Sequence, residues 1–225
     1  MKAIILGFAA LLSVAFSSAG KADTIIGNGG VGSGVACCFG DSAYGTAVSA
    51  GQTITVPSDN VLQSFSFYAE GGTFRAVVAE WYAQVLTGQY QSGVVGPILY
   101  QSPAISGTGT LTQYTFNTGA LTLDPENRAI LFLVAEQDNS WFKIGAYGGP
   151  NLPDSYTGGQ FETSPDGVSW ISPVSNGYLD ASFSADFSPA VPETSTWAML
   201  LIGFAGIGFY RRSRKTATSF NLCAR

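Results

Sequence analysis

Short runs of alternating polarity recur through the middle of this 225-residue chain. The run 178–187 puts apolar side chains on one face and polar ones on the other: Leu179, Ala181, Phe183, Ala185 and Phe187 against Asp180, Ser182, Ser184 and Asp186. A period of two is typical of a β-strand with one buried and one solvated face. The runs 61–68 and 110–116 also alternate, and no stretch between the chain ends has a helical period. This pattern restricts the body of the chain to β-sheet.

Further strands are predicted where apolar and β-branched residues lie between turn sequences: 53–56, 73–82, 98–100, 129–135, 141–146 and 168–171. The run 129–135 is apolar without interruption, which predicts a central strand covered on both faces. Many short strands joined by turns favour an all-β fold, an antiparallel two-sheet jelly-roll-like sandwich over residues 23–189.

The predicted sandwich is acidic and the whole chain lacks histidine. Residues 24–189 hold three basic and thirteen acidic residues, a net charge of −10. A surface of this sign excludes nucleic acid as a partner bound through its phosphates. The absence of histidine argues against serine–histidine triads and most catalytic zinc sites.

The N-terminus predicts export. A basic Lys2 precedes an apolar stretch from Ala3 to Phe16, and small and polar residues follow up to Ala22. This order is that of a secretory signal peptide over residues 1–22, with cleavage after Ala22 favoured over cleavage after Ala19.

The C-terminus has a tripartite arrangement over residues 190–215. The motif Pro192, Glu193 and Thr194 comes first, an uncharged stretch predicts a membrane helix over about 196–210, and a basic cluster follows: Arg211, Arg212, Arg214 and Lys215. Trp197 and Tyr210 bracket the stretch as interfacial anchors would, and the cluster would stay in the cytoplasm. The fourteen residues 197–210 extend about 21 Å as a helix, against a hydrocarbon core of roughly 30 Å. Residues 216–225 are expected to form a disordered tail.

This arrangement resembles the PEP-CTERM sorting domain of Gram-negative bacteria. The resemblance implies recognition and cleavage by an exosortase, a membrane cysteine protease or transpeptidase, after a membrane-anchored stage. Thr194 stands where family members usually carry a second proline.

The cysteine and acidic residues suggest few sites. Cys37 and Cys38 either form a vicinal disulfide or remain two thiols, and two adjacent sulfurs without histidine do not make a metal site. We therefore expect no metal and no other cofactor. Calcium is a weak alternative at three sequences, each explained equally well by turn formation: Asp124-Pro125-Glu126-Asn127, Asp138-Asn139 and Asp166-Gly167.

Aromatic residues suggest a glycan-binding surface. Sandwich domains bind sugar rings on exposed aromatic faces, and four residues are candidates: Trp81, Tyr82, Trp141 and Trp170. The alternative is that these rings belong to the core. Paired carboxylates of a glycosidase are a second alternative, with Glu80 facing Glu136 or Glu162.

Together, the sequence predicts a non-enzymatic, exported and surface-sorted protein. Its sandwich would serve adhesion or structure in the envelope or the exopolysaccharide matrix. The alternative from another class is a secreted carbohydrate-active enzyme or glycan-binding module.

Overall fold

A computed structural model describes residues 23–40, 47–84, 92–136, 140–148, 154–172, 178–190 and Phe204. The chain forms two compact units, Met1–Pro189 and Ala190–Arg225. Within these described residues, no helix is both long and apolar enough to cross a membrane. The predicted signal peptide and basic cluster lie outside them, as does the predicted membrane helix apart from Phe204, which is helical and exposed.

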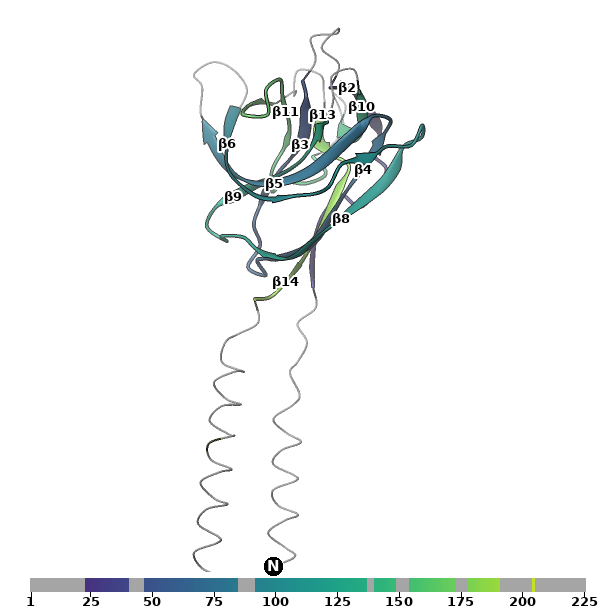
Figure 1. Cartoon of the computed structure of the whole chain (residues 1–225). Coiled ribbons are helices and arrows are strands. Elements are labelled where there is room, and N and C mark those ends of the chain that lie inside the picture. The colour runs from purple at the N-terminus through teal and green to yellow at the C-terminus, as the bar shows by residue number, and fades with distance from the viewer. Residues whose placement is uncertain are drawn as a thin grey trace, which may run out of the picture. The chain divides into compact units, whose positions relative to one another are not determined.

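The first unit consists of two antiparallel sheets (Figure 1). The first sheet contains β1 (Thr24–Gly27), β2 (Gly34–Phe39), β4 (Val61–Glu70), β8 (Thr112–Thr122), β10 (Phe142–Gly148), β13 (Tyr178–Ala181) and β14 (Phe183–Ser188). Its order is β1-β14-β4-β10-β13, with β8 paired to β4 and β2 paired to β10. The prediction of an all-β, antiparallel, two-sheet fold is confirmed.

The second sheet contains β3 (Ser49–Thr55), β5 (Thr73–Gln84), β6 (Ser92–Gln101), β7 (Ile105–Ser106), β9 (Arg128–Ala135), β11 (Phe161–Ser164) and β12 (Ser169–Ile171). Its order is β6-β12-β11-β3-β9-β5-β7, and β6 also pairs with β5. Six strands therefore form a closed ring: β3, β9, β5, β6, β12 and β11. No local pattern in the sequence indicates this closure.

The β9 strand confirms the prediction of a central strand covered on both faces. Leu131 and Leu133 point into the core between the two sheets, whereas Ile130 and Phe132 point into the ring. All four side chains are at most 4% exposed. The uninterrupted apolar run follows from this position, because a solvated face would favour alternation.

Aromatic rings dominate the core between the sheets. Phe74 of the second sheet packs against Phe142 of the first, with ring centroids 5.5 Å apart, and Phe65 packs against Tyr100 at 6.1 Å. Burial of each such phenylalanine contributes roughly 1.5–3 kcal/mol, so these contacts hold the two sheets together.

A smaller core fills the ring. Trp170 of β12 packs edge-on against Phe132 at 4.9 Å and against Trp81 at 6.3 Å. Gly93 of β6 leaves the space that the Trp81 indole occupies, because a Cβ at this position would overlap the indole. The two tryptophans thereby join β5, β6, β9 and β12 across the inside of the ring.

A buried polar bridge joins the sheets at β3 and β13. Gln52 Nε2 donates to Asp180 Oδ1 (2.9 Å), and the Ala181 N–H donates to Gln52 Oε1 (2.8 Å). Asp180 is fully buried, so its predicted place on a solvated strand face is wrong. The Ser155 and Tyr156 N–H groups also donate to the Asp180 carboxylate. The predicted strand 178–187 is interrupted at Ser182, between β13 and β14.

The first and last strands of the sandwich lie side by side. β1 pairs with β14, with Thr24 opposite Phe187. The chain therefore enters and leaves the sandwich at the same edge of the first sheet (Figure 1).

We expect Gly93→Ala to destabilise the fold by about 1–3 kcal/mol, the usual cost of overpacking a core. The added methyl group would force the Trp81 indole out of its packing against Trp170. Urea unfolding followed by tryptophan fluorescence measures the change. Gly109→Ala is the matched control, because nothing lies within 4 Å of a Cβ built there. Equal stability of the two variants would contradict the packing described for the ring.

Candidate functional site

The predicted sorting residues lie outside the described part of the chain. These are the Pro192–Thr194 motif, the anchors Trp197 and Tyr210, and the basic cluster Arg211–Lys215. The calcium candidate Asp138-Asn139 also lies outside it. Their roles stay predictions from sequence.

The four candidate aromatic residues do not form one glycan platform. Trp81 and Trp170 are 5% and 1% exposed, so their proposed role as a platform is wrong and their rings belong to the core of the ring. Tyr82 and Trp141 are 46% and 41% exposed. Trp141 contacts Gly71 and Gly72 before the start of β5, whereas Tyr82 lies near its end, about 30 Å away at roughly 3.3 Å per residue. One sugar ring cannot rest on both.

The predicted carboxylate pairs are not formed. Glu136 forms an ion pair with Arg75, which lowers the pKa of Glu136 through their hydrogen bond. The Glu136 N–H binds the Thr73 carbonyl at the start of β5, about 23 Å along the strand from Glu80. Glycosidase carboxylates lie roughly 5–10 Å apart. Pairing of Glu80 with Glu136 is therefore wrong.

Glu162 is enclosed by the second sheet. The register of β11 on β3 pairs Glu162 with Gly51 and Ser164 with Ser49. A Cβ on Gly51 would touch the Phe132 side chain, so this face points into the ring. Glu162 is 0% exposed, and burial raises its pKa to about 8 although Gln160 Nε2 donates to Oε1. Glu80 does not share this interior, so Glu162 is not its partner either.

The interior of the ring holds further polar atoms without a hydrogen-bond partner. They are Ser49 Oγ, Glu162 Oε2 and Trp170 Nε1. Such atoms are costly to bury, and a protonated carboxyl group costs less than a carboxylate at the same place. The ring thus encloses an apolar core together with a few buried polar atoms that have no hydrogen-bond partner.

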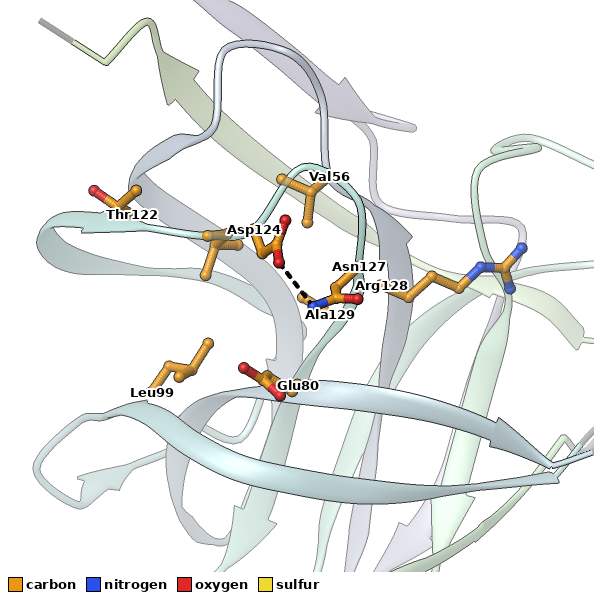
Figure 2. Close-up of a pocket in the computed structure, with 9 residues that line it drawn as sticks. Val56, Glu80, Leu99, Thr122, Asp124, Asn127, Arg128 and Ala129 are labelled. Atoms are coloured by element: carbon orange, nitrogen blue, oxygen red, sulfur yellow. Dashed lines mark hydrogen bonds between the residues drawn. The ribbon is translucent and has the colours of Figure 1, made fainter.

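A pocket lies where the end of the sandwich core meets the turn between β8 and β9 (Figure 2). Its volume is about 190 Å³, and it is lined by Val56, Glu80, Leu99, Thr122, Leu123, Asp124, Asn127, Arg128 and Ala129. Figure 2 shows Glu80 pointing from β5 towards the Asp124–Asn127 turn, while the Arg128 side chain points away. The volume suits one small polar group, because drug-sized ligands occupy roughly 300–1,000 Å³.

Neighbouring groups orient the acids of this pocket. The Tyr82 hydroxyl donates to Glu80 Oε2, and this hydrogen bond raises the pKa of Tyr82. Asp124 Oδ1 accepts the Glu126 N–H at 2.9 Å, and Oδ2 accepts Asn127 Nδ2 at 3.0 Å. Glu80 and Asp124 were predicted to belong to different sites, and folding brings them to one pocket. No sequence pattern marked Val56 and Leu99 as pocket residues, because apolar residues are common throughout the chain.

The acidic turns and the cysteines have structural partners. Asp166 Oδ1 accepts the Val168 and Ser169 N–H groups, which lower the pKa of this carboxylate. Turn formation, the alternative to calcium, is thus observed at Asp124 and Asp166. Cys37 and Cys38 are joined by a disulfide within β2. No cluster of three metal-binding side chains occurs among the residues that the structure describes.

Comparisons with known proteins do not show a family for this chain. No protein-family model matches the chain, and no curated protein matches it. A solved structure similar to the chain contains the cysteine protease and lectin-like domains of Cwp84, a surface layer associated protein of Clostridium difficile, with a TM-score of 0.41 and 14% identity. The match covers 64% of this chain and 32% of that one, so the chain spans about a third of the matched structure. A likeness of this size carries no inference about function.

We expect Glu162→Gln to remove a pH dependence of stability. The pKa of Glu162 is about 8 in the folded protein and near 4.5 when unfolded, so the folded state binds one more proton between these values. Folding stability should fall as pH rises through this window, by up to about 1.4 kcal/mol per pH unit. Urea unfolding from pH 5 to pH 8 should show a shallower slope for the variant. Glu126→Gln, at an exposed turn, is the control and should keep the wild-type slope.

Proposed function

We propose that this protein is an exported, non-enzymatic β-sandwich that is sorted to the cell surface. An exosortase-type enzyme would cleave it near Pro192-Glu193 after a membrane-anchored stage. The released sandwich would then serve a structural or adhesive role in the envelope or the extracellular polysaccharide matrix.

The order of motifs in the C-terminal segment carries this proposal. Pro192-Glu193, an uncharged stretch and the cluster Arg211–Lys215 follow one another over residues 192–215, and residues 1–22 have the order of a secretory signal peptide. The pairing of Thr24 with Phe187 supports it. The predicted leader and anchor would therefore be attached to neighbouring strands of the sandwich.

The acid positions support a non-enzymatic role. The chain has no histidine, and the two acids considered as partners of Glu80 have other contacts. Glu136 pairs with Arg75, Glu162 is enclosed in the ring, and Asp124 holds a turn.

Mass spectrometry of the native protein tests the sorting proposal. We expect a new C-terminus near Pro192-Glu193 and loss of the segment through Arg225, because cleavage precedes release. Replacing Pro192 and Glu193 by alanine should leave the full-length protein in the membrane fraction. Replacing Asp124 and Glu126 by alanine, at an exposed turn in the sandwich, is the control and should leave processing unchanged. An intact Arg225 in the mature wild-type protein would refute processing and indicate a retained anchor.

A glycan-binding role is the second candidate, and the pocket at Glu80 is the observation that favours it. Carboxylate and amide groups of Glu80, Asp124 and Asn127 converge on a small cavity, and the exposed Tyr82 ring adjoins it. Sugar hydroxyl groups bind such acceptors and donors, and sugar rings stack on tyrosine. The size of the pocket suits one small polar group of a glycan, such as a hydroxyl-bearing edge of a sugar residue.

We expect Glu80→Gln to weaken binding to the exopolysaccharide of the producing cell about tenfold, because the acceptor held by Tyr82 becomes an amide. Isothermal titration calorimetry with the purified polysaccharide measures the loss. Glu126→Gln lies outside the pocket and should bind like the wild type. If the wild-type protein binds no polysaccharide, the glycan-binding role is wrong, whereas the sorting proposal is unaffected.

A further inference from the structure

The strand β8 is an edge without the usual protection. Among the described strands it pairs with β4 only, and residues Thr112–Asn117 match Ala69–Ser64 one for one. Its eleven residues, Thr112–Thr122, include no charge and no proline. Natural sheet edges are normally blunted by charges, prolines, short length or a covering segment, because unpaired N–H and C=O groups template association.

The other strand edges in the described part of the chain are paired, short or irregular. Ring closure pairs both sides of the strands of the second sheet, except for the two-residue β7. In the first sheet β1 and β13 have four residues each, and the pairing of β2 with β10 shifts register beside the Cys37–Cys38 disulfide. A bulge interrupts β8 only beyond Asn117. The segment Thr112–Asn117 thus stands out as a long regular edge.

The two faces of this segment restrict what can pair with it. Phe116 is 2% exposed and packs on Phe65 at 5.3 Å, and Tyr114 packs edge-on against Phe74 at 5.2 Å. Gln113, Thr115 and Asn117 are exposed on the other face. An added strand that continues the sheet must carry the same alternation, apolar towards the core side and polar outward.

We propose that β8 pairs in antiparallel fashion with β8 of a second copy of this chain, which extends the first sheet across a two-fold axis. Such an axis places the same strand, with the same alternation, on both sides of the interface. It also places the strand opposite its own sequence, so that a charged strand would face like charges across the axis. β8 is uncharged although the domain carries a net charge of −10, so this edge avoids the repulsion that an acidic strand would suffer. Pairing through β8 is expected whether or not the C-terminal segment is processed.

Sedimentation velocity of the full-length chain in mild detergent tests the pairing. We expect a concentration-dependent dimer for the wild type. Thr115→Lys places a charge on each side of the two-fold edge and should raise the dimer dissociation constant at least about tenfold. Thr115→Val is the matched control, because it keeps the branched shape without charge, and it should dimerise like the wild type.

Two further measurements keep the test decisive. Asn117→Lys repeats the change at the same edge, and equal melting temperatures show that each variant is folded. Hydrogen exchange in the β8 amides should slow as the wild-type concentration rises. A wild type that stays monomeric at the highest attainable concentration overturns the proposal. An unchanged dimer in both lysine variants overturns it too, since association through the C-terminal segment would survive them. Loss of a different co-purifying protein in these variants would assign the edge to that partner and also overturn self-pairing.

Discussion

Burial of β9 on both of its faces is the constraint on which the rest of the structure depends. Leu131 and Leu133 contribute to the core between the sheets, and Ile130 and Phe132 contribute to the core of the ring. A strand buried in this way needs cover on both sides. The first sheet supplies one cover, and closure of β6 onto β5 and β12 supplies the other, with Trp170 packed on Phe132 and Trp81 packed on Trp170.

The buried polar groups of this fold differ in whether they find hydrogen-bond partners. Gln52 and Asp180 satisfy one another across the sheets, and the Ser155 and Tyr156 N–H groups complete the carboxylate shell, yet burial still raises the pKa of Asp180 to about 6. Glu162 has one hydrogen bond and one orphan oxygen. The bridge can specify how the two sheets align, because misalignment would leave both groups unpaired. Inside the ring, by contrast, the polar atoms without a partner lower the stability of the fold.

The candidate site shows where prediction from sequence succeeds and where it stops. Glu80 and Asp124 were each selectable, because a carboxylate beside aromatic residues or in an Asp-Pro turn is visible locally. That they line one pocket depends on β5 and the β8–β9 turn meeting at the end of the core, which no local pattern records. The same limit explains the errors at Trp81 and Trp170. No local pattern in their strands records that the second sheet closes, and the closed ring encloses the face that carries them.

The sequence by itself determined the β class, the turns at Asp124 and Asp166, and the central position of 129–135, because each depends on local periodicity or backbone chemistry. It is also the whole basis for the export and sorting predictions. Only the tertiary structure decided the closure of the second sheet, the burial of Asp180 and Glu162, the adjacency of the two ends and the exposure of β8 as an edge. These depend on which strands become neighbours, and strand pairing is set by contacts between residues far apart in the chain.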